Sequence, residues 1–310
     1  MKEQKNLFLA IGISIGIIVF FQLLFPTQPF EQSITQNNTS DSEVLDPAAS
    51  IDNKISTTID VVKPKEEVLI KSERILIENS SLLGSINLTG AILDDLNLLE
   101  YKDSLEENSK NIELLLPDET SNPYYIEFGW KEFNGNTIQV PDLNTKWKSN
   151  SSKLTPTNPV TLQWTNDSNI TFLINFSIDK NYMFSIKQEV INNSSSNIEV
   201  YPYRLIKRIN TPQTINFFIL HEGLISLLND ELLEKNYDDL EDDCTNALQV
   251  KDSYCDNKSS GGWLGFTDKY WMSTLIPEPN EPININYRHG NNGRDNYRAG
   301  YVGQIFKIGA

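Results

Sequence analysis

A strict alternation of apolar and polar side chains is the strongest local pattern in this 310-residue chain. In the run ITFLINFSI, positions 170 to 178, every second residue is a large apolar one. Successive residues of an extended chain point to opposite sides, so the run predicts a β-strand with one buried face. Turn-forming residues follow at 179 to 181, and the alternation resumes in YMFSIK at 182 to 187. The two runs together predict an antiparallel hairpin.

Shorter runs of the same kind recur along most of the chain. Further strands are predicted at positions 74–78, 85–89, 112–116, 124–130, 160–164, 198–203, 217–220, 270–276, 283–287 and 297–302. Convincing amphipathic helices are nearly absent, and the chain is 39% hydrophobic, which is enough for one large core. The pattern predicts an all-β fold, a large β-sandwich over residues 70–310.

An uncharged apolar run, LFLAIGISIGIIVFFQLLF, occupies positions 7 to 25. As a helix it would be about 28 Å long, close to the thickness of the hydrocarbon core of a bilayer. A cleavable signal peptide is the alternative, but such a peptide has a shorter apolar region followed by small residues. Bulky residues occupy positions 20 to 26 here. We therefore expect one uncleaved transmembrane helix at 7–25.

The charges that flank this run predict its orientation. Lys2 and Lys5 precede it, and no Lys or Arg occurs from position 26 to 53. Because basic residues stay on the cytoplasmic side, residues 1–6 are expected in the cytoplasm and everything after position 25 outside it. Residues 26–69 are rich in polar residues without a sustained period, which predicts a flexible tether before the folded domain.

The overall charge limits the classes of partner. With 42 acidic and 26 basic side chains, the formal net charge is −16. Such a surface repels phosphate backbones, so we expect no nucleic acid partner. The same charge disfavours electrostatic attachment of the globular part to an anionic membrane surface.

Cys244 and Cys255, the two cysteines of the chain, lie close together in an acidic, polar stretch. In an oxidising compartment they would form a local disulfide, and two free thiols on a loop are the equally weighted alternative. The two histidines, His221 and His289, show no metal-ligand spacing relative to the cysteines. No metal site is therefore expected.

Sequence motifs of catalysis are absent: the chain has no GxSxG, HExxH or GxxxxGK[ST]. His221 and Glu222 could act as an acid and base pair, but neighbouring strand residues point to opposite faces. We favour a histidine hydrogen-bonded at a strand end, with Gly223 beginning a turn. The acidic run YDDLEDD at 237–243 lacks the spacing of a calcium loop and is interpreted as a solvated loop. We expect no catalytic residue, no cofactor and no enzymatic activity.

Turn glycines and aromatic residues combine in GGWLGFTDKYW at positions 261 to 271. Exposed aromatic residues could stack on sugars or grip an extended peptide, whereas buried ones fill a core. Core packing is the default interpretation, because large aromatic residues are usually buried.

Several segments together resemble the large first periplasmic domain of the YidC/Oxa/Alb family of membrane protein insertases. The resemblance covers most of the chain after the tether, and the segments are jointly specific although each is weak alone. They are SLLGSINLTGAILDDLNL at 81–98, NPYYIEFGW at 122–130, LTPTNPVTLQW at 154–164, YMFSIKQEVIN at 182–192, VYPYRLIKR at 200–208, FFILHEG at 217–223, YDDL at 237–240 and GGWLGFTDKYW at 261–271.

The resemblance implies a β-supersandwich like that of galactose mutarotase-like proteins, in the periplasm of a bacterium and anchored in its inner membrane. It implies an insertase or chaperone for nascent integral membrane proteins, acting alone or beside the Sec translocon with its SecD and SecF subunits. No covalent step or cofactor is implied, because a hydrophilic groove among further membrane helices lowers the free energy of moving polar groups through hydrocarbon.

This chain departs from the family pattern at its end. The sequence stops at Ala310 without a second apolar span. We therefore expect the anchor and the periplasmic domain of an insertase, without the inserting helices. The alternatives are an anchored periplasmic docking scaffold and, less favoured, a carbohydrate-binding or mutarotase-like protein, because a fold alone does not determine function.

Overall fold

The structure, a computed structural model, describes residues 62–106, 108–133, 138–213, 220–245, 253–268 and 270–309. All of them belong to one compact unit, Val44–Ala310. The expected cytoplasmic start at 1–6, the transmembrane helix at 7–25 and the tether up to position 61 lie outside the described residues. Among the described residues, no helix combines the length and the apolar character needed to cross a membrane.

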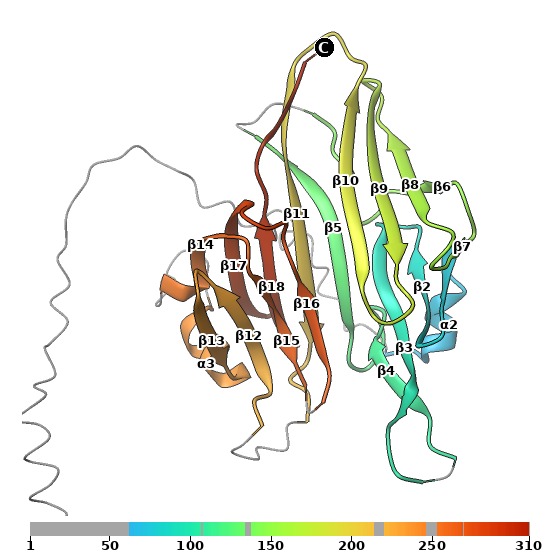
Figure 1. The fold of residues 1–310 in the computed structure, drawn as a ribbon, viewed down its shortest axis with the longest axis vertical. Helices are drawn as coiled ribbons and strands as arrows, with labels where there is room; N and C mark the ends of the chain where they lie inside the picture. Colours follow the sequence, from blue (N-terminus) through green and yellow to red (C-terminus); the bar gives the residue numbers. More distant parts are fainter. Residues whose placement is uncertain are drawn as a thin grey trace, which may run out of the picture. The chain divides into compact units, whose positions relative to one another are not determined.

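An 11-stranded sheet forms one layer of the fold (Figure 1). Its order is β14, β17, β18, β11, β5, β3, β2, β1, β7, while β19 pairs with β11 and β4 with β3. The strands are β1 Arg74–Glu78, β2 Leu82–Asn87, β3 Ile92–Lys102, β4 Asn111–Leu115, β5 Tyr124–Glu132, β7 Lys153–Leu154, β11 Ile198–Ile209, β14 Asp256–Ser260, β17 Pro282–Asn291, β18 Asp295–Val302 and β19 Phe306–Ile308.

Two separate four-stranded antiparallel sheets lie against this layer (Figure 1). One has the order β10, β9, β8, β6, and the other has the order β13, β12, β15, β16. Their strands are β6 Lys148–Ser149, β8 Val160–Thr165, β9 Ile170–Ile178, β10 Phe184–Asn192, β12 Gly223–Leu228, β13 Glu231–Lys235, β15 Trp263–Thr267 and β16 Met272–Leu275. The helices are α2 Lys65–Leu69, α3 Tyr237–Asp243 and the 3-10 turn η2 Ser253–Cys255.

Aromatic side chains join the two layers in the core. Phe172 and Phe176 of β9 are fully buried, as their alternation predicts. The ring of Phe172 lies 5.1 Å from that of Trp130 on β5, and the ring of Phe176 lies 5.6 Å from that of Phe128. These edge-to-face contacts are favourable for aromatic rings, so β5 and β9 are held face to face.

The predicted all-β fold is confirmed, and β9 and β10 pair as the predicted hairpin, with Phe184 opposite Ile178. The strand predicted at 217–220 lies mostly outside the described residues. Sequence reasoning missed β3, because Asp94 and Asp95 interrupt its apolar pattern. The folded part also begins before position 70, since helix α2 lies within the span expected to be a tether.

The two aspartates of β3 are buried among basic and hydroxyl partners. Arg74 forms an ion pair with Asp94 and donates from Nε to Ser85 Oγ at 2.7 Å. Ser85 Oγ donates to Asp95 Oδ2 at 2.7 Å, and Lys65 Nζ lies 2.8 Å from Asp95 Oδ1. Burial nevertheless raises the pKa of Asp94 to about 6, because desolvation outweighs the opposing effect of Arg74.

Replacing a core isoleucine tests the layer packing. Ile174→Ala in β9 should lower the free energy of unfolding by about 2–5 kcal/mol, because its side chain is fully buried. Ile191→Ala in β10 removes the same atoms from a side chain that is 47% exposed. It should cost less than about 1 kcal/mol. Urea unfolding of both variants measures the difference, and equal losses would contradict the assigned core.

The aspartate pair predicts a pH dependence of stability. The folded protein binds a proton at Asp94 below about pH 6, whereas the unfolded chain does so only near its ordinary pKa of 3.8. Lowering the pH from 7 to 4 should therefore stabilise the native chain relative to Asp94→Asn by about 1–3 kcal/mol. Urea unfolding at several pH values tests this, and parallel stability curves for the two proteins would refute it.

Candidate functional site

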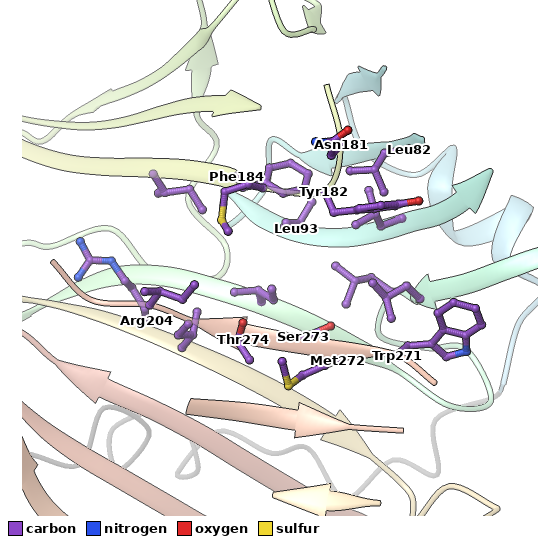
Figure 2. A pocket seen from close by; sticks show the side chains of 18 of the residues that line it. Leu82, Leu93, Asn181, Tyr182, Phe184, Arg204, Trp271, Met272, Ser273 and Thr274 are labelled. Atoms are coloured by element: carbon purple, nitrogen blue, oxygen red, sulfur yellow. The ribbon is translucent and has the colours of Figure 1, made fainter. Parts of the chain in front are cut away.

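A groove of about 820 Å³ lies where the two four-stranded sheets leave part of the large sheet uncovered (Figure 2). Its floor consists of side chains from β3, β4 and β5. One wall is formed by β16 with the residues on either side of it, and the other by the β9–β10 turn and the start of β10. The lining is predominantly apolar, as in sites that bind apolar ligands or side chains.

The floor results from the alternation of strand residues. Ile126 and Phe128 of β5 point into the groove, as do Leu93, Leu96 and Leu98 of β3. A register shift beside the two aspartates adds one residue between Leu93 and Leu96, so both leucines lie on the groove side. The floor is therefore a continuation of the face that forms the core elsewhere.

Aromatic residues gather at one end of the groove. The ring of Tyr101 lies 4.7 Å from that of Trp271 and 6.4 Å from that of Tyr182. Tyr182 donates from its hydroxyl to Glu100 Oε2 at 2.7 Å, and this bond raises its pKa to about 12. The tyrosine hydroxyl consequently stays protonated and neutral over the physiological range.

Charged residues lie among the apolar lining. Asp179, Glu278 and Glu281 supply three carboxylates, against the single guanidinium of Arg204. The guanidinium carbon of Arg204 lies 5.3 Å from the ring centre of Tyr301. Burial raises the pKa of Tyr301 to about 12, while nearby Arg204 lowers it. The groove thus carries a net negative charge at neutral pH.

The sequence interpretation of the glycine and aromatic run at 261–271 is partly correct. Leu264 and Phe266 belong to the core, at 0% and 1% exposure. Core packing is wrong for Tyr270, which is 69% exposed, and for Trp271, which is half-buried and lines the groove. The reason is that the β15–β16 turn carries these two residues beyond the sheet.

The histidines are held by hydrogen bonds. His221 Nε2 lies 2.8 Å from the carbonyl oxygen of Leu224, and Gly223 begins strand β12. His289 Nδ1 lies 2.6 Å from Thr245 Oγ1, and its Nε2 lies 3.1 Å from Asp295 Oδ1.

His289 also belongs to the one group of potential metal ligands found among the described residues, together with Glu241 and Asp295. Sequence reasoning missed this group because its members come from α3, β17 and β18. Both ring nitrogens of His289 already have partners, and Glu241 accepts a hydrogen bond from Tyr297. The group therefore forms a partly buried hydrogen-bonded network that joins α3, β17 and β18.

The acidic run at 237–243 is helix α3, not the solvated loop interpreted from its composition. The Asn236 side chain accepts from the backbone N–H of Asp239, whose carboxylate accepts from the N–H of Asn236. This capping box satisfies two donors at the helix start. Tyr237 and Leu240 are buried, so the helix has an apolar face, which composition alone concealed.

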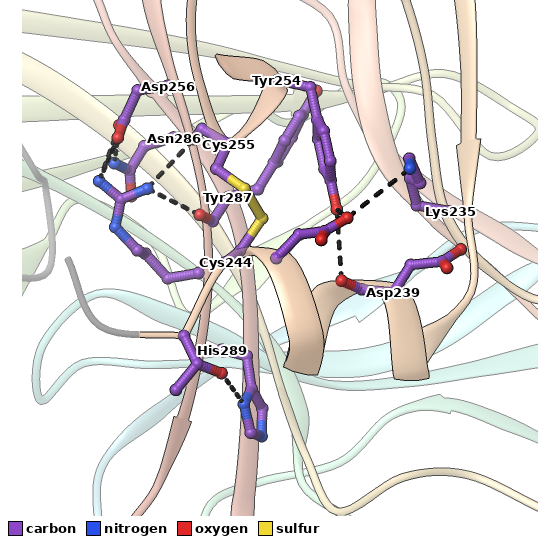
Figure 3. Close-up of a disulfide and its surroundings, with 12 residues drawn as sticks. Lys235, Asp239, Cys244, Tyr254, Cys255, Asp256, Asn286, Tyr287 and His289 are labelled. Atoms are coloured by element: carbon purple, nitrogen blue, oxygen red, sulfur yellow. Dashed lines mark hydrogen bonds and ion pairs between the residues drawn. A yellow bond between two sulfur atoms is a disulfide. The ribbon is translucent and has the colours of Figure 1, made fainter. Parts of the chain in front are cut away.

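Cys244 and Cys255 are bonded to each other in the structure, with their Cα atoms 5.7 Å apart and both side chains fully buried (Figure 3). The bond joins the end of α3 to η2, next to β17. Arg288 Nη2 lies 2.7 and 2.8 Å from the two carboxylate oxygens of Asp256, and Arg288 Nη1 donates to the carbonyl oxygen of Cys255 at 3.1 Å.

Removing this bond should destabilise the domain. Replacing Cys244 and Cys255 together by serine should lower the free energy of unfolding by about 2–3 kcal/mol, because a short closed loop loses its constraint in the unfolded chain. Urea unfolding with and without dithiothreitol measures the effect. The reductant should weaken the native chain and leave the variant unchanged, and equal responses of the two proteins would contradict the bond.

The matching family model and the similar curated proteins point to the same family. Residues 74–310 match the family described as YidC periplasmic domain. A "Membrane protein insertase YidC" of Granulibacter bethesdensis is 35% identical over 97% of this chain and 51% of its own length. Relatives of the same name from Pelagibacter ubique and Rickettsia bellii are 34% and 35% identical, over 95% and 92% of this chain.

The chain belongs to the YidC periplasmic domain family. It spans about half the length of these curated relatives, namely 48% to 51%. Solved structures with a similar fold include a galactose mutarotase related enzyme from Lactobacillus acidophilus. That enzyme is 9% identical, with a TM-score of 0.42 over 76% of this chain and 95% of its own.

Proposed function

We propose that this chain is the anchor and the periplasmic domain of an insertase that aids the insertion and folding of integral membrane proteins. It acts alone or beside the Sec translocon, where SecD and SecF are the proposed contacts. The N-terminus lies in the cytoplasm, and the described domain lies in the periplasm of a bacterial inner membrane. Membership of the YidC periplasmic domain family is the observation that carries this proposal.

The apolar groove supports a part for the domain itself. Nascent membrane proteins expose long apolar segments, and water-exposed apolar surface is unfavourable by about 25 cal/mol per Å². A groove with a leucine and phenylalanine floor can cover part of such a segment at the membrane surface. The work of the domain is then physical protection and docking, with no bond made or broken.

Photocrosslinking in cells tests this proposal. A photoreactive amino acid at Met272, which lines the groove and is 51% exposed, should form adducts with nascent membrane proteins. The same residue at Leu232 is the matched control, because Leu232 is 59% exposed on β13, away from the groove. The gene of the source organism should carry the substitutions, so that every encoded segment is present.

Adducts with membrane proteins at Met272 that exceed those at Leu232 are the expected result. Adducts with SecD or SecF from any exposed position of the domain would support the proposed contact with the translocon. The proposal fails if neither membrane proteins nor Sec components are captured anywhere on the domain.

A further inference from the structure

Strand β16 borders the groove with its edge and not only with a face. The floor strand β5 contributes alternate residues, Ile126 and Phe128, whereas positions 270 to 276 contribute every residue in turn. Side chains alternate between the two faces of a strand. An unbroken run of lining residues therefore means that the main chain itself faces the groove.

The hydrogen bonds of the β15–β16 hairpin determine which main-chain groups point into the groove. Asp268 N–H donates to the carbonyl oxygen of Trp271 at 2.8 Å, and the next pairs are Thr267 with Met272, then Phe266 with Ser273. Hydrogen-bonded and non-hydrogen-bonded pairs alternate along an antiparallel ladder. The N–H and C=O groups of residues 272 and 274 therefore point away from β15.

These groups have no strand partner. Among the described residues, β16 pairs with β15 alone and ends its four-stranded sheet. The opposite edge of the same sheet, β13, has the sequence ELLEK, in which three of five residues are charged. Charged residues protect an edge strand from further pairing. Strand β16, with the sequence MSTL, has no such protection.

The charge of the groove lining favours a basic occupant. The guanidinium of Arg204 is the single basic group in the lining of the groove among the described residues. The carboxylates of Asp179, Glu278 and Glu281 outnumber this one guanidinium, so a basic residue of the occupant is complementary to the lining.

We infer that the groove binds one extended, apolar polypeptide segment with a basic end, which adds as a strand to the free edge of β16. Its main chain pairs with Met272 and Thr274, and its alternate apolar side chains cover the floor of β3 and β5. Its basic end meets Glu278 and Glu281. The inference rests on the proposed function for the source of the segment, which is a membrane protein during insertion.

Peptide binding to the full 310-residue chain in lipid nanodiscs tests strand addition. The probe is a fluorescein-labelled peptide of about twelve residues that alternates leucine with serine and ends in two lysines. Fluorescence anisotropy should show saturable binding. Methylation of alternate amide nitrogens on the pairing edge of the peptide should weaken binding at least tenfold, because strand addition depends on main-chain hydrogen bonds. This comparison leaves the protein unchanged.

Proline substitutions test the assigned edge. Thr274→Pro removes a donor that points into the groove, and proline is tolerated on an edge strand. Leu232→Pro is the matched control, because the turn at Asn229 and Asp230, with φ of 53° and 65°, places the corresponding outward donor of β13 at Leu232. Thr274→Pro should weaken binding at least tenfold, and Leu232→Pro should leave it unchanged.

The charge of the rim is tested separately. The double variant Glu278→Gln and Glu281→Gln should weaken binding of the lysine peptide at least threefold, and binding of its uncharged analogue should not change. An equal effect on both peptides would contradict the assigned basic end.

Several outcomes would overturn strand addition. They are absence of saturable binding, equal binding of the methylated peptide, and equal binding by the Thr274→Pro chain. If these occur while adducts at Met272 persist in cells, strand addition is wrong and the proposed function stands. If the peptide binds as expected but no membrane protein or Sec component is captured in cells, the proposed function fails instead.

Discussion

The burial of one face of the large sheet is the constraint on which the rest of the structure depends. An 11-stranded sheet presents more apolar surface than either four-stranded sheet can cover. Strand β5 shows the consequence within a few residues. Trp130 is buried at 2% exposure against Phe172, while Phe128 both contacts Phe176 and lines the groove. Core and groove are therefore two parts of one surface, distinguished only by whether the second layer lies over them.

The division of the second layer also explains why an unpaired strand edge borders this surface. A continuous second sheet would pair β16 with a neighbour, whereas two short sheets each leave an edge. Charged side chains normally prevent a solvent-facing edge strand from pairing with another chain. Strand β13 follows this rule with Glu231, Glu234 and Lys235. The edge of β16 is bordered by apolar and aromatic side chains instead. The polar main-chain groups of this edge thus lie beside the apolar groove.

Sequence reasoning predicted the elements whose pattern is local. The alternation at 170–178 is strand β9, with the same bounds in the structure. Prediction from the sequence failed where residues far apart in the chain determine whether a strand forms. Asp94 and Asp95 are tolerated in β3 because Arg74 and Lys65 form ion pairs with them from other elements. The groove was not predicted for the same reason, since its lining joins segments separated by more than a hundred positions. The aromatic residues at 270 and 271 were the available signal, and their exposure depends on a turn that the composition does not reveal.

The acidic character of the chain limits what can cover the apolar groove. A large exposed apolar patch on a soluble domain promotes association between copies, and a net charge of −16 opposes it by mutual repulsion. The carboxylates of Glu278 and Glu281 bring the same repulsion to the rim of the groove itself. Two copies would have to bring four of these carboxylates together before their grooves could meet. A basic, apolar segment meets no such barrier, so the charge that opposes the association of two copies also favours the proposed occupant of the groove.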